Sequence, residues 1–317
     1  MNDPGSSRRV AGALTICAAV AIASSLDAMV KWLSAGYPVH ELLVIRGLVA
    51  LPLLFGVVCY ENLLGSLRPR RLELVIVRGL LLASANLAFS LATAAIAIAD
   101  TVAIYFTMPF FVAAVAAPFL GERVRWYRWL AILAGFAGVI IMIRPGAGVF
   151  EPAALFALYA AFGYGVGQAM ARPLAHINAS VIAFHQNTIF LLVAAALSLT
   201  FGAGQFAVPA HQSLRFLMSA WIWPGQADLL LMTGIGVMAA VAMPMFAQAY
   251  RIADASFIAP FEYTAMFWAV VWGAVLFGDF PDGWTWSGAA VVITAGLFML
   301  HMDNVYQRRR APSHGIA

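Results

Sequence analysis

Apolar residues fill most of the chain in long stretches that short polar turns separate. A membrane-spanning helix needs about 20 mainly apolar residues. The pattern therefore predicts ten transmembrane helices, at residues 10–33, 39–60, 72–95, 98–120, 126–143, 152–171, 180–201, 228–250, 255–277 and 284–302. The longest connection, residues 202–227, contains Trp221 and Trp223 and is expected to lie along the lipid headgroups.

Composition agrees with this pattern. The 317 residues are 63% hydrophobic and 10% charged, whereas a soluble domain carries about 25% charged residues. We expect an all-α polytopic membrane protein. The net charge of +4 follows from the placement of arginines around the spans and indicates no nucleic-acid surface. Cys17 and Cys59 both lie in apolar stretches, so no disulfide framework is expected.

The basic residues predict the orientation. If the N-terminus is cytoplasmic, fourteen of them fall on the cytoplasmic side and only Lys31, Arg144 and Arg215 on the other. Cytoplasmic loops of membrane proteins carry an excess of Lys and Arg. Both termini are therefore expected to be cytoplasmic. Arg8 and Arg9 before an apolar run also resemble a cleavable signal peptide, but the repeat described next requires that run as a helix.

The two halves of the chain resemble each other at an offset of 141 to 158 residues. The matching segments are 27–31 with 168–172, 98–100 with 252–254, 121–122 with 278–279, 126 with 284, and 138 with 296. Each half has five predicted spans, so the second must enter the membrane upside down. We predict a cytoplasmic tail at 1–9, repeats at 10–145 and 146–302, and a cytoplasmic tail at 303–317. Inverted repeats that enclose a midplane site are typical of secondary transporters.

Several segments also carry a family resemblance: "DAMVKWL", "HELLVIRG", "RGLLLASANLAF", "WYRWLAILAGFAG" and "IADASFIAPFEYTAMF". With ten spans arranged as five plus five, the chain resembles the EamA family of the drug/metabolite transporter superfamily. The resemblance is to the branch with S-adenosylmethionine and riboflavin uptake proteins. It implies that spans one, three, four, six, eight and nine line a central cavity. Amino-acid and drug exporters belong to the same family, so the direction of transport stays open.

Asp27, in span one, is the first candidate for a functional charge. Lys31 lies one helical turn later, so a neutralised pair of these two residues is one interpretation. In the repeat, however, Lys31 matches the cation Arg172 while Asp27 matches the neutral Gln168. The scaffold therefore does not require a carboxylate at Asp27. Ionisable side chains inside membranes usually mark transport pathways, so we predict that Asp27 contacts the solute or carries a coupling proton.

Arg46 in span two needs an anionic partner or a watery cavity. Glu41 is five residues earlier and poorly placed for it, and the repeat sets Arg46 against Asn187. A structural ion pair between spans and a contact with the solute are equally compatible with the sequence.

Glu262 is a carboxylate within span nine, two residues after Pro260, which loosens the local helix. Its repeat counterpart is Met108, so symmetry again does not require the charge. We predict that Glu262 lines the path and selects or couples the solute. An interhelix salt bridge is the alternative.

Amide and aromatic side chains complete the candidate site, since they can stack on or hydrogen-bond a planar solute. They are Asn86, Tyr105, Tyr164, Gln168, Tyr263 and Trp268. Ordinary helix packing is the competing explanation for each of them. Gly163 and Gly167 form a GxxxG pattern that favours close helix approach.

The sequence contains no Walker-type phosphate loop and no metal-binding or hydrolase motif. We therefore predict no cofactor and no enzyme activity, but a secondary transporter of the bacterial inner membrane. Its solute would be a cationic or zwitterionic metabolite of the S-adenosylmethionine, riboflavin or amino-acid kind. An exporter of amino acids or drugs, a lipid-modifying membrane enzyme and a passive channel are the rival interpretations. A proton or ion as coupling species and a homodimer stay open.

Overall fold

The computed structural model describes residues 4–111, 114, 126–143, 151–174, 176–206, 210–252 and 259–310. Within these residues the chain is helical with short connections and no strand, so the all-α prediction is confirmed. The longer helices are α1 (Pro4–Leu33), α2 (Val39–Tyr60), α3 (Leu72–Ala95), α4 (Ile98–Tyr105), α6 (Trp126–Ile143), α7 (Ala153–Ala169), α8 (Ala179–Phe201), α10 (Gln226–Ile252), α12 (Thr264–Trp272) and α13 (Gly283–Arg310). Shorter elements are α9 (Gln212–Met218), the 3-10 turns Leu64–Ser66, Arg172–Leu174 and Ala259–Tyr263, and the π-helical turn Gly273–Phe277.

Five helices are long and apolar enough to cross a membrane: Val10–Leu33, Val39–Tyr60, Leu72–Ala95, Ala179–Phe201 and Gln226–Phe246. Shorter apolar helices occupy Ile98–Phe111, Trp129–Met142, Ala153–Ala169, Phe261–Phe277 and Gly283–Met299. The molecule is thus a multi-pass membrane protein.

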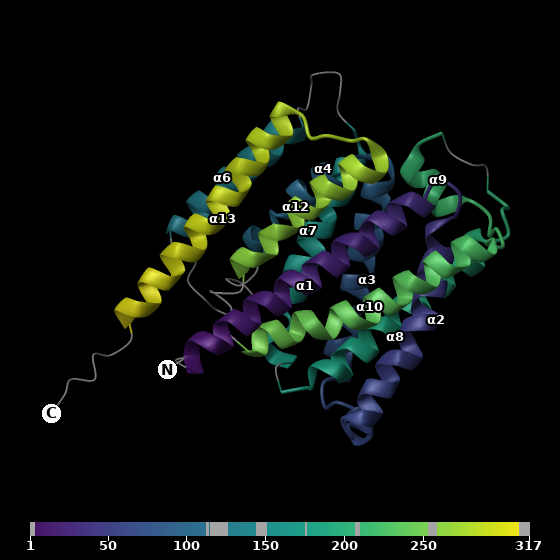
Figure 1. Ribbon diagram of the computed structural model, residues 1–317, viewed down its shortest axis with the longest axis horizontal. Coiled ribbons are helices and arrows are strands. Elements are labelled where there is room, and N and C mark those ends of the chain that lie inside the picture. Colours follow the sequence, from purple (N-terminus) through teal and green to yellow (C-terminus); the bar gives the residue numbers. More distant parts are fainter. Residues whose placement is uncertain are drawn as a thin grey trace.

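The helices pack in pairs that join distant parts of the chain. α1 lies along α10, α3 along α7, α2 along α8, and α6 along α13. Figure 1 shows α6 and α13 side by side at one edge of the molecule. Close approach depends on small residues there, because a Cβ on Gly138 would collide with the carbonyl of Gly288. A Cβ on Gly163 or Gly167 would likewise press on Ala85 or Leu82 of α3, as the GxxxG pattern predicts for a close helix pair.

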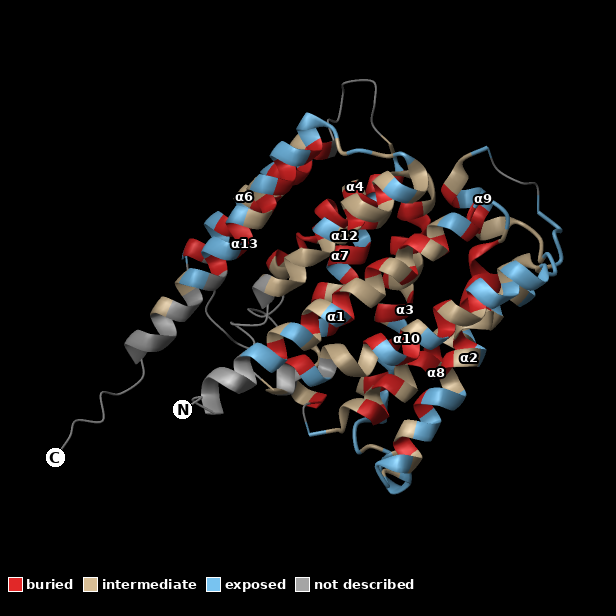
Figure 2. Cartoon of the chain, viewed as in Figure 1, coloured by how far each residue is buried: buried red, intermediate tan, exposed pale blue. Residues whose placement is uncertain are grey.

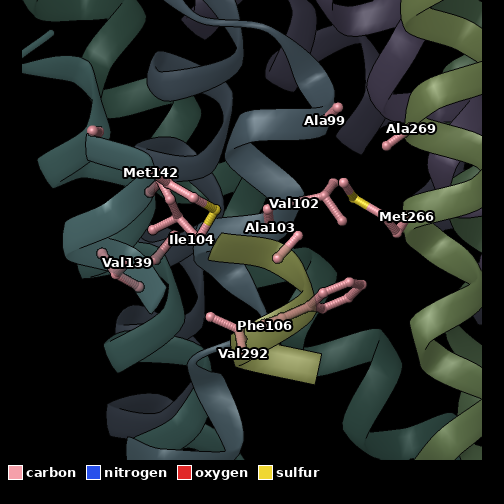
Figure 3. Packing of buried hydrophobic residues seen from close by; sticks show 14 of the residues in the cluster. Ala99, Val102, Ala103, Ile104, Phe106, Val139, Met142, Met266, Ala269 and Val292 are labelled. Atoms are coloured by element: carbon pink, nitrogen blue, oxygen red, sulfur yellow. The ribbon is translucent and has the colours of Figure 1, made fainter. Parts of the chain in front are cut away.

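Figure 2 shows buried positions gathered where the helices face one another, and exposed positions on the outer faces. Many exposed residues are large and apolar, including Trp129, Leu133 and Phe298. In water such a surface would be costly, whereas against lipid tails it is favourable. The largest buried cluster surrounds α4. Figure 3 shows Val102 of α4 beside Met266 of α12, and Ile104 beside Met142 of α6.

The connection between α8 and α10 folds over the ends of α2 and α3. Phe216 of α9 is 2% exposed, and the Ser213 hydroxyl donates to the Leu91 carbonyl at 2.7 Å. The Glu41 carboxylate accepts a bond from the Ile222 amide at 3.0 Å. Trp223 is exposed, in keeping with a position among headgroups, whereas Trp221 packs near the ring of His40.

Candidate functional site

Five of the predicted polar and aromatic residues lie near one another, each on a different helix. They are Asp27 of α1, Arg46 of α2, Asn86 of α3, Tyr105 of α4 and Tyr164 of α7. We call these five residues the central cluster. All five side chains are only partly buried.

Asn86 links the cluster through both ends of its amide. Its Oδ1 accepts a hydrogen bond from Nη1 of Arg46 at 3.3 Å. Its Nδ2 donates to the phenol oxygen of Tyr164 at 3.1 Å. Because lipid offers no hydrogen-bond partners, polar groups within the membrane must find them inside the protein. The chain of Arg46, Asn86 and Tyr164 does this across three helices.

Asp27 faces the same cluster. Its charge interacts with that of Arg46 and with the phenol of Tyr164. Among the described residues, no ion pair or hydrogen bond engages the Asp27 carboxylate. A guanidinium has five N–H donors, and the described contacts of Arg46 use one of them, on Asn86. The cluster therefore combines one carboxyl group and one guanidinium that both keep capacity for further hydrogen bonds.

Aromatic rings form one wall of the cluster. Tyr105 meets Tyr164 edge to face, with ring centroids 5.4 Å apart. Phe89 of α3 also packs edge to face with Tyr105 at 5.6 Å, and the Tyr105 hydroxyl donates a bond to the sulfur of Met108 at 3.4 Å. Edge-to-face contacts fix ring orientation. Phe89 was not among the predicted residues, because an apolar phenylalanine carries no signal that separates it from packing.

Lys31 does not pair with Asp27, although the two lie one turn apart. Its ammonium donates to the carbonyl of Ile96 at 2.7 Å and lies 3.6 Å from the Asp279 carboxylate. Arg46, and not Lys31, is therefore the cation that interacts with Asp27. The Glu41 carboxylate likewise accepts a hydrogen bond from the Ile222 amide, so Glu41 is not the partner of Arg46.

Asn187, the repeat counterpart of Arg46, is buried at 2% exposure and donates to the carbonyl of Gly47 at 3.2 Å. It thus contacts the residue next to Arg46 on α2. This bond helps hold α8 against α2, which carries the guanidinium.

The remaining predicted residues lie elsewhere. Gln168 is one turn beyond Tyr164 on α7 and is exposed. Trp268 packs with a small group of residues that includes Ile16 and Val20 of α1. These two precede Asp27 by two to three turns, which is about 10 Å or more along the helix.

Tyr263 and Glu262 belong to the turn Ala259–Tyr263 at the start of the same span. The ring of Tyr263 meets Phe106 at 4.9 Å, and a Cβ on Gly296 of α13 would collide with its hydroxyl. That hydroxyl is buried without a hydrogen-bond partner among the described residues. Phe261, next to Glu262, joins the same group around Ile16 as Trp268. Glu262 thus lies closer to the beginning of α1 than Asp27 does.

The chain is similar in sequence to known transport proteins. The sequence pattern of the EamA-like transporter family matches residues 10–144. A riboflavin transporter of Rhizobium johnstonii is 30% identical over 308 residues, which cover 97% of this chain and 96% of that protein. An S-adenosylmethionine uptake transporter of Rickettsia prowazekii is 26% identical, covering 87% and 88%.

Two further similarities bear on direction and fold. A pseudopaline exporter of Pseudomonas aeruginosa is 25% identical, covering 86% of this chain and 89% of that protein. A solved crystal structure aligns with a TM-score of 0.64 at 17% identity, over 96% of this chain and 99% of that one. At this identity the likeness concerns the fold alone.

Proposed function

This chain belongs to the EamA-like transporter family, and we propose that it carries a small organic metabolite across the bacterial inner membrane, with the central cluster as its solute site. The observation that carries this proposal is the chain of hydrogen bonds through Arg46, Asn86 and Tyr164, with Asp27 facing it. Five helices contribute one polar or aromatic side chain each to a single place. Isolated polar residues with separate structural roles would not gather in this way.

The helix contacts support two inverted repeats of five spans. Matching the halves pairs α1 with α7, α2 with α8, α3 with α10, α4 with α12, and α6 with α13. If each helix is replaced by its counterpart in the other half, every contact should have an equivalent. The contact α1–α10 corresponds to α7–α3, α2–α10 to α8–α3, and α1–α12 to α7–α4, and all six contacts occur. The contacts α2–α8, α4–α12 and α6–α13 map onto themselves and also occur. Repeats related in this way allow one half to rock against the other around a shared site.

The chemistry of the cluster favours a solute with balanced charge. Asp27 and Arg46 offset each other, so the site does not select a cation on charge alone. A carboxylate or carbonyl of the solute would bind Arg46, an N–H group would bind Asp27, and a planar ring would lie against Tyr105 and Tyr164. Riboflavin and zwitterionic amino-acid-like metabolites meet these requirements. S-adenosylmethionine does so through its amino-acid end.

Glu262, Tyr263, Trp268 and Gln168 have a different proposed role. Since Glu262 and Trp268 lie toward the beginning of α1, they would act along the path between the cluster and one face of the membrane. Gln168 would lie at the other half's matching position on α7. Asp27 or Glu262 would be the group that couples transport to a proton or ion.

Export is the second candidate, because one relative is a pseudopaline exporter. The names of the relatives and of the family indicate a transporter and not an enzyme. Direction is decided by uptake assays on right-side-out and inside-out vesicles.

Uptake into proteoliposomes tests the proposal. Purified protein is reconstituted, and the entry of labelled riboflavin or S-adenosylmethionine is followed with and without unlabelled solute inside. Saturable counterflow is expected for the wild type and loss of it for Asn86→Ala. Glu151→Gln, which lies outside the cluster, serves as the control. Equal counterflow in all three proteins would reject the cluster as the solute site.

A further inference from the structure

The end of the bundle where α1 finishes contains several contacts that join the two halves of the chain. Lys31, the only lysine, lies there with a side chain that is 12% exposed. Its ammonium donates to the Ile96 carbonyl at 2.7 Å, within the first half. It also lies 3.6 Å from the Asp279 carboxylate and 5.1 Å from the centre of the Phe277 ring, both in the second half. One cation thus binds an anion, a carbonyl and an aromatic face across the boundary.

Two neighbouring contacts cross the same boundary. Trp32, next to Lys31, meets Phe277 with ring centroids 6.2 Å apart. The Thr285 hydroxyl at the start of α13 donates to the Asp100 carboxylate of α4 at 2.7 Å. Asp100 also interacts electrostatically with Lys31. The crossing contacts therefore form one connected set, which we call the Lys31 lock.

In the second half, a distinctive turn of the backbone positions Asp279. The π-helical turn Gly273–Phe277 ends at Gly278, which has a left-handed φ of +68°. The amide of Asp279 then donates back to the Gly273 carbonyl at 3.0 Å. A π-helical turn is uncommon and often marks a functional place. Here it turns the chain so that Asp279 faces the end of α1.

We infer that the Lys31 lock closes this end of the transporter and must break for the solute site to open toward that face. The inference rests on the proposed alternating movement of the two halves. The Lys31 lock combines polar contacts, one of them through the partly exposed Asp279, with one aromatic contact, and such individually weak contacts bias one state yet break reversibly. A continuous apolar contact at the same place would separate less readily. Lys31 and Asp279 thereby act on the transport cycle without touching the solute.

Pulsed electron–electron distance measurements test this inference. Spin labels are placed at Gly36→Cys and Gly283→Cys, because both positions are exposed and a Cβ there meets nothing within 4 Å. They lie in different halves near the lock. The native thiols Cys17 and Cys59 are free and are replaced by serine in the background.

Lys31→Met and Asp279→Asn should each shift the label distances toward longer values. Lys31→Arg should retain the wild-type distribution, and the exchanged pair Lys31→Asp with Asp279→Lys should recover part of it. Glu151→Gln is the matched control, because it removes a carboxylate that hydrogen-bonds His211 at 2.7 Å, a contact that lies wholly within the second half. It should leave the distances unchanged.

Wild-type distances in both Lys31→Met and Asp279→Asn, or the same shift in Glu151→Gln, would overturn the lock. Uptake measured on the same proteins separates this outcome from failure of the proposed function. Unchanged distances together with normal wild-type counterflow would reject only the lock. Shifted distances in the Lys31 and Asp279 variants, together with a wild type that carries neither riboflavin nor S-adenosylmethionine, would support the lock and reject the proposed solutes.

Discussion

The side-chain amide of Asn86 in α3 donates a hydrogen bond to the phenol oxygen of Tyr164 in α7, 3.1 Å away. Since its other end accepts from Arg46, the orientation of the amide is fixed by two partners on two other helices. Asn86 is thus the residue through which α2, α3 and α7 share one polar connection. Its neighbours on α3 are packed closely against α7, because Gly163 and Gly167 admit Ala85 and Leu82.

Replacing Asn86 should affect Arg46 and Tyr164 together. Tyr164→Phe removes one hydrogen bond, typically worth about 1 kcal/mol, so solute binding should weaken about fivefold. Asn86→Ala leaves two partners unsatisfied and should weaken it further. The double variant should resemble Asn86→Ala alone, because the two changes remove a shared contact. Calorimetric dissociation constants would check this, and strictly additive losses would show that the residues act separately.

Asp27 and Arg46 should depend on each other for stability. Asp27→Asn leaves a cation without its counter-charge, and Arg46→Gln leaves an anion. Breaking a fully buried pair costs about 3–5 kcal/mol, and these half-buried residues should cost less, about 1–3 kcal/mol. The double variant should unfold at a higher temperature than either single variant. Thermal unfolding in detergent measures this, and a double variant less stable than both would contradict the pairing.

A substitution at Tyr263 should compensate for one at Gly296. A Cβ on Gly296 would collide with the Tyr263 hydroxyl, so Gly296→Ala should lower stability by about 1–3 kcal/mol. Tyr263→Phe removes a buried hydroxyl that has no partner among the described residues, and should be close to neutral. Combining the two changes should restore much of the stability lost in Gly296→Ala. Unfolding midpoints of the three variants test this, and no recovery would mean that other atoms cause the collision.

Tyr37, in the turn between α1 and α2, should give a pH signature. Its hydroxyl donates to the Asp228 carboxylate at 2.6 Å, and this bond raises the pKa of Tyr37 above its ordinary value of 10.0. Because the folded-state pKa exceeds the unfolded one, the bond contributes stability below pH 10, and this is lost as the pH rises through the folded-state value.

Wild type should therefore be more stable than Tyr37→Phe by a constant amount between about pH 7 and 9, and the difference should shrink above pH 10. Unfolding midpoints of the two proteins across this range provide the measurement. A difference that grows with pH would show that Asp228 is not the partner.

The apolar pattern predicted the all-helical character of the chain and several helix boundaries. Predicted spans such as 39–60, 72–95 and 126–143 coincide with α2, α3 and α6, because about 20 apolar residues leave the backbone no alternative to a helix in lipid. The pattern did not predict where helices are interrupted. The 3-10 and π turns that flank α12 arise from packing and from Pro260 and Gly278, which a hydropathy average smooths over.

The candidate site was predicted in part. Asp27, Arg46 and Asn86 were recognisable because polar side chains are costly inside a membrane. Their mutual contacts were not, since a helix sequence gives the spacing along one helix and no rotation against its neighbours. The same limit explains why the partner of Lys31 could not be predicted. Spacing favoured Asp27 as its neighbour, whereas the fold places Asp279, 248 positions later, beside it.

Counterflow of labelled riboflavin or S-adenosylmethionine in proteoliposomes, compared between wild type and Asp27→Asn, tests the central cluster most directly. Saturable counterflow is expected for the wild type, and its loss is expected in the variant while the variant remains folded by circular dichroism. Undiminished counterflow in a folded Asp27→Asn protein, with the same result for Arg46→Gln, would contradict this expectation.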